Sequence, residues 1–222
     1  RALQKKGKIT FTDAWEAVSI EFPNSLTSDS TSIKDALEQY GRQVSGGAWL
    51  LKPQVVQRVT QHNEIIAILA EAGDALGYTI WVGKKEQSEF AEGILGAKKS
   101  LKSYVNANLS KLSGITDLET VEMIDLLWIQ GNQVITAFEV ESTTTMTSGL
   151  VRGSNLPVDV IKYLVIPEER EEQLQRKMKS PMFAERYASD NWNILYFDAL
   201  RNNYKRLKNK VTTIEELQHQ KV

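Results

Sequence analysis

Hydrophobic residues in the first fifty positions recur at helical spacing in two short segments. In residues 11–18 and 32–40 the apolar side chains follow this spacing, which predicts two short amphipathic helices. The glycine pair 46–47 then predicts a turn, and the apolar residues 48–51 predict a short strand. The chain therefore opens with a helix, a second helix, a glycine turn and a strand.

From residue 62 onward, stretches of helical and of strand periodicity alternate. Apolar residues on one side of 62–76 predict a helix, which Gly77 ends. Further strands are predicted at 78–82, 123–129, 134–141, 161–166 and 192–197, and further helices at 90–112, 146–154 and 169–179. Gly131 and Asn132 form a two-residue hairpin turn between two of these strands. This order predicts an α/β fold, with a mixed central sheet flanked by helices.

The change of pattern divides the chain into a small unit, residues 1–55, and a larger domain, residues 56–222. A length of 222 residues suits a compact domain with a small appendage. Hydrophobic residues make up 41% of the chain and charged residues 25%, so wholesale disorder is excluded. The first residue is Arg1 and not Met, and we therefore expect the chain to be part of a longer polypeptide.

The composition excludes several kinds of site and location. The chain has no cysteine, so disulfides, zinc–cysteine sites, iron–sulfur clusters and thiol nucleophiles are excluded. No apolar run approaches the ~18 residues that a membrane helix needs, and no signal peptide is evident. We expect an intracellular protein with no membrane partner. The net charge is -1, so a polyanionic partner must be held by local basic patches.

Three carboxylates, those of Asp125, Glu139 and Glu141, interrupt the two apolar strands around the hairpin. Glu139 and Glu141 are two residues apart and share one face of their strand. Position 125 pairs near position 138 if the turn is tight, so Asp125 could lie diagonally beside Glu139, with a bulge deciding the detail. Carboxylates converging in this way are tolerable where a hard divalent cation neutralises them. The alternative is that they are exposed on an edge strand or pair with lysines, although apolar residues precede them on the same face.

These residues resemble a known family. Asp125, a hairpin and then Glu139-Val140-Glu141, set in the order helix–strand–strand–strand–helix–strand, resemble the PD-(D/E)XK nuclease superfamily, which has the restriction-endonuclease-like fold. The resemblance covers about residues 56 to 200. More locally, residues 137–145 together with Ser148 and Arg152 resemble a subgroup found in restriction and DNA-modification systems. Two positions depart from the general pattern: Ile124 replaces the usual Pro, and Glu141 replaces the usual Lys, as in Glu-x-Glu restriction enzymes.

The resemblance implies a metal-dependent reaction on DNA. Asp125, Glu139 and the backbone carbonyl of Val140 would hold Mg²⁺, with Mn²⁺ as a possible substitute, and the ion would polarise the scissile phosphate and lower the pKa of a water. Glu141 would orient or deprotonate that water, or ligate a second metal. Glu64 resembles the helical Glu that many members add to the site; the alternative is an acid favoured by the helix macrodipole. His62 is expected either at the site or as a capping or surface residue.

Polar and basic residues around the carboxylates are candidates for DNA contacts. Thr143, Ser148 and Arg152 follow the acids directly and would contact phosphates beside the site. The alternative for the hydroxyl residues is an ordinary helix cap. Lys205 and Arg206 belong to a basic run near the C-terminus, which is either a solvated helix face or a nucleic-acid contact.

We therefore expect a Mg²⁺-dependent DNA endonuclease domain of a restriction-modification or related defence system, located in a prokaryotic cytoplasm. Residues 1–55 are expected to form a winged-helix-like unit for DNA binding or docking. A homodimer is a possible partner arrangement, since cutting both strands asks for two active sites. A linked or associated methyltransferase, or another restriction component, is a further possible partner.

Two alternatives remain open. The first is a catalytically inactive DNA-binding or specificity module with a nuclease-like fold, which the replacement of Lys by Glu141 favours. The second is a protein-interaction domain whose basic segments are merely solvated. Binding of a divalent metal separates the enzyme from the inactive module, and salt-dependent DNA affinity excludes the interaction domain.

Overall fold

The computed structural model describes residues 2–24, 28–91, 98–142, 146–181, 184–185, 187, 191–207 and 213–218. The chain divides into two compact units, Arg1–Val59 and Thr60–Val222.

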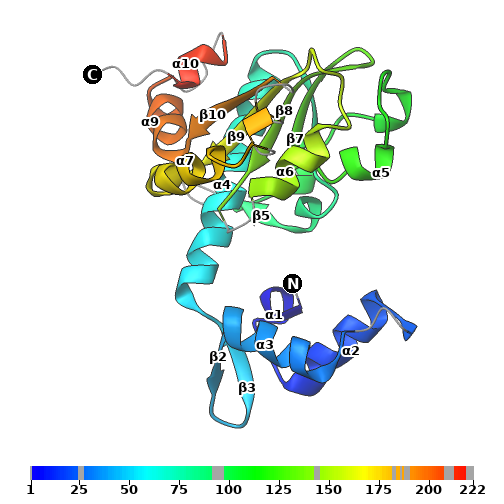
Figure 1. Ribbon diagram of the computed structural model, residues 1–222, viewed down its shortest axis with the longest axis vertical. Helices are drawn as coiled ribbons and strands as arrows, with labels where there is room; N and C mark the ends of the chain where they lie inside the picture. Colours follow the sequence, from blue (N-terminus) through cyan, green and yellow to red (C-terminus); the bar gives the residue numbers. More distant parts are fainter. Residues whose placement is uncertain are drawn as a thin grey trace. The chain divides into compact units, whose positions relative to one another are not determined.

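The first unit combines three helices with a small antiparallel sheet (Figure 1, blue to cyan). Its elements are α1 (Ala2–Lys6), β1 (Lys8–Ile9), α2 (Phe11–Glu21), α3 (Ser30–Tyr40), β2 (Gly41–Val44) and β3 (Ala48–Leu51), and the strand order is β1-β3-β2. The two predicted helices and the predicted strand are confirmed. Strand β2 was not predicted, because its residues are mostly polar and only Gly41 is buried.

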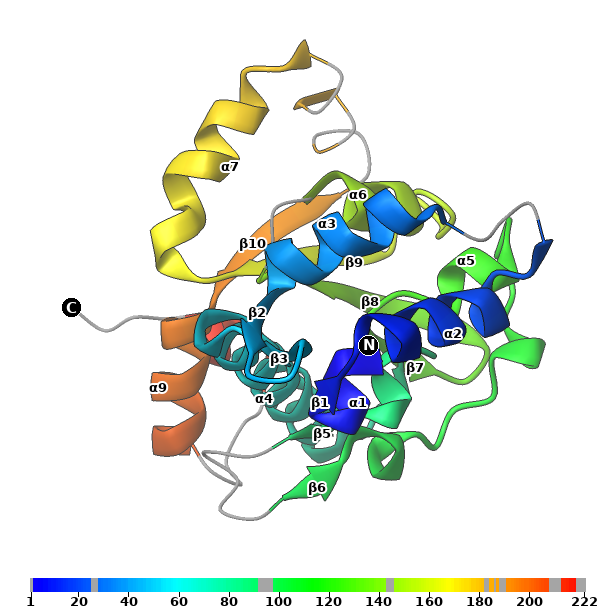
Figure 2. The same cartoon turned by 90° about the horizontal axis from the view of Figure 1, so that it is seen from below.

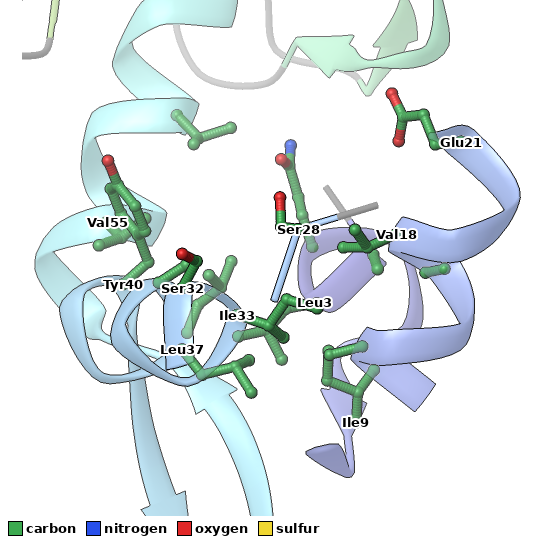
Figure 3. Close-up of a pocket in the computed structure, with 17 residues that line it drawn as sticks. Leu3, Ile9, Val18, Glu21, Ser28, Ser32, Ile33, Leu37, Tyr40 and Val55 are labelled. Carbon is green, nitrogen blue, oxygen red and sulfur yellow. The ribbon is translucent and has the colours of Figure 1, made fainter. Parts of the chain in front are cut away.

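Apolar side chains from the helices form a core in this unit, with Leu3, Ile33 and Leu37 among its buried members. The Thr10 hydroxyl accepts a hydrogen bond from the backbone N–H of Asp13, and the Asp13 carboxylate accepts one from the backbone N–H of Thr10, so a capping box fixes the beginning of α2. Beside this core lies an apolar cavity of about 420 Å³ (Figure 3). It is lined by residues of α1, α2 and α3 and by Leu51, Val55 and Val59.

Helix α4 (Pro53–Ala75) is longer than the predicted helix at 62–76. It begins at a proline, which is favourable in the first turn because the missing N–H has no partner there in any case. Its buried residues start only at Asn63. The earlier turns therefore lack the buried stripe by which a helix is recognised in a sequence.

The second unit is built on a five-stranded mixed sheet (Figure 1). Its strands are β4 (Thr79–Val82), β7 (Leu126–Gln130), β8 (Gln133–Val140), β9 (Ile161–Ile166) and β10 (Trp192–Tyr196), in the order β10-β9-β8-β7-β4. Strands β4, β7 and β8 are antiparallel to one another, whereas β8, β9 and β10 are parallel. The predicted mixed sheet is confirmed, and the Gly131-Asn132 turn joins β7 to β8 as predicted.

Helices cover both faces of this sheet (Figure 2). Alternate residues of each strand enter different hydrophobic clusters, as strand geometry requires. Phe138 and Val140 pack in the cluster of α4 and α9 (Phe197–Leu207). Leu164 and Ile166 pack with α6 (Met146–Gly153) and α7 (Glu171–Met178) on the opposite face. The short helix α5 (Leu118–Val121) contributes Val121 to the cluster that contains Ala137.

The predicted helix at 90–112 is wrong. Strands β5 (Phe90–Ala91) and β6 (Lys99–Ser100) pair there, followed by 3₁₀ turns η3 (Leu101–Tyr104) and η4 (Leu109–Lys111), while residues 92–97 lie outside the described residues. The cause is tertiary pairing. The backbone N–H groups of Asn106 and Ala107 both donate to the carbonyl of Ile80 in β4, and the Asn106 side chain accepts from the Ile80 N–H. The segment therefore satisfies its backbone groups on the sheet edge and not within a helix.

The remaining described elements are short: η2 (Glu86–Ser88), η5 (Glu168–Arg170), which leads directly into α7, and α10 (Glu215–Gln218). No helix among the described residues is both long and apolar enough to cross a membrane.

Gly73 lies where α4 packs closely against the sheet. A Cβ atom there would lie 2.7 Å from Ile80 Cδ1 and would also collide with the Trp128 indole, whose Nε1 donates to the carbonyl of Leu69. Gly73→Ala should destabilise the protein by about 1–3 kcal/mol through overpacking. In an unobstructed helix the same change would stabilise by about 1 kcal/mol. Urea unfolding measures whether the free energy of unfolding falls or rises, with Asp74→Ala at the exposed neighbouring position as the control. A gain in stability for Gly73→Ala would contradict the close packing.

Candidate functional site

Three carboxylates meet where β7 begins and β8 ends. The two strands are antiparallel, and Leu126 pairs with Phe138. One step further along the ladder, Asp125 therefore faces Glu139. A bulge produces this register: Ile129 pairs with Val134 but Trp128 pairs with Thr136, so β8 carries one extra residue. Without the bulge, residue 125 would face position 138, and the Asp125 and Glu139 side chains would lie on opposite faces of the sheet.

All three carboxylates are buried. Their exposed fractions are 6% for Asp125, 0% for Glu139 and 7% for Glu141. Strand β8 lies between β7 and β9 in the middle of the sheet. The alternative of solvated carboxylates on an edge strand is therefore wrong, and each buried charge needs a partner.

Asp125 is held from two sides. The backbone N–H of Val140 donates to its Oδ2 at 2.8 Å, and His62 Nε2 on α4 lies 3.4 Å from the same oxygen. Burial alone would lower the pKa of His62, but the hydrogen bond and charge of Asp125 outweigh burial and raise that pKa to about 9. His62 thus contacts the carboxylate cluster formed by Asp125, Glu139 and Glu141.

Glu139 is bound by Arg152 of α6. Arg152 Nε donates to Glu139 Oε1 at 2.8 Å, and Nη2 donates to Oε2, so the guanidinium spans the carboxylate. Burial, followed by the charge of Asp125, raises the pKa of Glu139 to about 8, against the opposing effect of Arg152. Gly149, in the preceding turn of α6, brings the helix against the Glu139 side chain.

Glu141 lies just past the end of β8. Its carbonyl accepts a hydrogen bond of 3.0 Å from Arg170 Nη1, and its N–H donates to the carbonyl of Val165 at 2.8 Å. Burial, followed by the charge of Asp125, raises the pKa of the Glu141 side chain to about 7. Burial and the crowding of negative charge thus raise the pKa values of two carboxyl groups in this cluster.

The donors in this cluster suit a hard cation. They are carboxylate oxygens, which Mg²⁺ prefers, and an added positive charge would relieve the repulsion that raises the two pKa values. Within the described residues, no three His, Asp or Glu side chains are grouped so as to hold a metal by themselves. The expected set of Asp125, Glu139 and the Val140 carbonyl has only two carboxylates, so waters would complete the shell of an ion.

The other residues expected at the site either have different partners or positions, or lie outside the residues that the structure describes. Glu64 on α4 is bound by Arg201 of α9, whose Nη2 and Nε donate to Glu64 Oε2 at 2.7 and 2.9 Å. Ser148 is exposed on α6. Thr143 lies outside the described residues, and so do the side chains of Lys205 and Arg206, whose backbone belongs to α9.

In a comparison with known protein families, the sequence matches the model of one family. The family described as the Type II restriction enzyme NmeDI C-terminal domain matches residues 51–217, which is most of the chain. The chain belongs to this family. Neither the curated proteins nor the solved structures yielded a match.

Membership in the NmeDI C-terminal domain family agrees with the coarser expectations from the sequence. The family indicates a component of a restriction-modification system, with nuclease as the class of activity and DNA as the class of substrate. The match includes Asp125, Glu139 and Glu141, and it begins two residues before α4. Most of the first unit lies outside it.

Proposed function

We propose that the second unit is a Mg²⁺-dependent DNA endonuclease domain that hydrolyses phosphodiester bonds, and that it is a PD-(D/E)XK nuclease of the Glu-x-Glu form. The observation that carries the proposal is the burial of Asp125, Glu139 and Glu141 together at the ends of β7 and β8. The order α4, β4, β7, β8, α6, β9 supports it, since this is the helix–strand–strand–strand–helix–strand order of that superfamily.

Each residue of the cluster has a role in this proposal. Asp125, Glu139 and the Val140 carbonyl hold the divalent ion, with Mn²⁺ as a substitute for Mg²⁺. When bound, the ion polarises the scissile phosphate and lowers the pKa of a water. Glu141 accepts the proton of the attacking water. Glu64 is engaged by Arg201, so we assign it a supporting role outside the ligand set.

Other parts of the chain would bind DNA. Thr143, Ser148 and Arg152 lie next to the cluster in the sequence, and Lys205 and Arg206 belong to the basic run that begins in α9. The helices and β2–β3 hairpin of the first unit support a winged-helix-like unit that binds duplex or docks to a further restriction component. A homodimer would supply two active sites for two strands, and a methyltransferase is a further proposed partner.

Plasmid cleavage tests the function directly. The protein should nick or cut plasmid DNA with Mg²⁺ or Mn²⁺ and should do nothing with EDTA. Glu139→Gln, which keeps the size of the side chain and one acceptor for Arg152, should abolish cutting. Cleavage that persists in EDTA, or in Glu139→Gln, would contradict the proposed metal site.

A catalytically inactive DNA-binding module is the second candidate. Two observations favour it: Glu141 stands where the superfamily usually has Lys, and both oxygens of Glu139 are already bound by Arg152. Calorimetric titration with Mn²⁺ separates the two candidates. The enzyme should bind Mn²⁺, and Asp125→Asn should abolish that binding. The inactive module should bind DNA in a salt-dependent manner but should not bind Mn²⁺ through Asp125.

A further inference from the structure

Arg152 binds the oxygens that the proposed metal would need. Glu139 is fully buried and holds the guanidinium through both carboxylate oxygens, while the Arg152 side chain is 23% exposed. A buried carboxylate is costly without a counter-charge, and in the structure Arg152 supplies that charge.

A divalent cation and Arg152 compete for Glu139. The guanidinium occupies a lone-pair site on each carboxylate oxygen. A metal ion bound to the same oxygens would lie within a few Å of the guanidinium, and two cations that close repel each other strongly in a buried site. The repulsion between the ion and the guanidinium therefore favours movement of Arg152 away from Glu139.

The packing of α6 lets the side chain move while the helix stays in place. A Cβ atom at Gly149 would lie 3.0 Å from Glu139 Cβ and Cγ, and one at Gly153 would lie 3.3 Å from Lys162 Cδ, so α6 is closely packed on the sheet on both sides of Arg152. Met146 and Leu150 anchor the same helix in a buried cluster. Because Arg152 is partly exposed in the last turn, rotation about its own side-chain bonds is sufficient to take the guanidinium off Glu139.

We propose that Arg152 exchanges Glu139 for a phosphate of DNA when the metal binds, so that the divalent ion and DNA bind with positive coupling. This rests on the proposed nuclease function. A guanidinium pairs with phosphate in the same two-pronged geometry as with a carboxylate. The metal releases Arg152 for DNA, and DNA removes the competitor of the metal, so each ligand raises the affinity for the other by the same factor. Arg152 is thus a positioning residue for Glu139 and a ligand for the substrate.

The Arg152 Nε–H resonance tests the exchange directly. In ¹H–¹⁵N spectra of the metal-free protein this proton should be protected by its bond to Glu139, and Arg152→Lys assigns the signal by removing it. Titration with Mg²⁺ alone should shift the signal and abolish its protection. Asp125→Asn, which lacks a metal ligand, should keep the signal unchanged at the same Mg²⁺ concentration.

The coupling is measured through DNA affinity. The dissociation constant for a short DNA duplex should fall by at least about tenfold on addition of Ca²⁺, used as a divalent ion that supports binding in place of Mg²⁺. In Arg152→Gln this factor should largely disappear. Arg176→Gln, which removes an exposed charge from α7, is the matched control and should retain it. Thermal unfolding checks that each variant is folded, and the spectroscopic test on the parent protein does not depend on any variant.

The outcomes separate this inference from the proposed function. If Mg²⁺ binds in a manner that Asp125→Asn abolishes, while the Arg152 signal stays protected at saturation, the exchange is wrong and the metal-dependent nuclease stands. If neither Mg²⁺ nor Mn²⁺ binds at all, with or without DNA, the proposed function fails and the exchange fails with it. Equal coupling factors in the parent and in Arg152→Gln would also overturn the exchange.

Discussion

Asp125→Asn should reduce metal-dependent DNA cleavage by about 10²- to 10³-fold, the scale of losing one preorganised electrostatic group at a reaction centre. The substitution removes the negative charge that attracts the divalent ion. It leaves a carbonyl oxygen that can still accept the 2.8 Å hydrogen bond from the N–H of Val140. The backbone link between the beginning of β7 and the end of β8 is therefore preserved, and we expect the fold and the DNA affinity without metal to remain. Single-turnover cleavage of a plasmid measures the effect.

Glu122→Gln is the matched control for this variant. Glu122 lies three residues before Asp125, and its carboxylate forms an ion pair with Lys84 that is largely solvated on the lysine side. Losing that pair should cost less than about 1 kcal/mol of stability and should leave cleavage unchanged. Cleavage by Asp125→Asn at the parental rate would show that the reaction does not depend on this cluster.

Raising the pH should destabilise the metal-free protein by several kcal/mol between about pH 5 and pH 9. The pKa values of Glu139 and Glu141 are raised to about 8 and about 7, so the folded state favours their protonated forms and loses stability as they ionise. His62, with its pKa raised to about 9, contributes stability that is present below its unfolded pKa and is lost as the pH rises through 9. All three groups change stability in the same direction. Urea unfolding in EDTA across this range measures the slope.

Divalent metal should reverse this trend. The ion binds the ionised carboxylates, so Mg²⁺ should stabilise the protein more at high pH than at low pH. Glu141→Gln should flatten the slope in EDTA, since it removes one of the titrating groups. A metal-free protein whose stability rises between neutral and alkaline pH would contradict the crowding of negative charge at this site.

Most of the larger domain could be predicted from the sequence, because its strands are bounded by clear turns and carry continuous apolar runs. The strand at 161–166 was predicted with its observed bounds, and the Gly131-Asn132 turn identified the hairpin. The helix predicted at 90–112 was wrong because backbone pairing with the edge of β4 decides its structure. That pairing involves residues remote in the sequence and leaves no periodic pattern.

The candidate site was predicted in part. Asp125, Glu139 and Glu141 were expected together from their spacing around the hairpin, and the structure brings them together. His62 was expected either at the site or at a helix cap, because the predicted helix began at this residue. Helix α4 begins at Pro53 instead, so His62 lies well inside the helix, where its side chain faces Asp125. Arg152 was expected to contact phosphate, and its contact with Glu139 depends on the close packing of α6, which no spacing indicates.

The extra residue in β8 means that the hairpin contains one residue more than its ladder needs to bring Asp125 opposite Glu139. Thr136 and Val134 pair with adjacent residues of β7, so Ile135 is the residue that the ladder leaves over. Removing it would let Thr136 follow Val134 directly, so Trp128 would still pair with Thr136 and Asp125 would still face Glu139, in a regular ladder without a bulge. Related chains that keep all three acids but have one residue fewer at this point of the hairpin would therefore be expected to retain the site on an unbulged ladder.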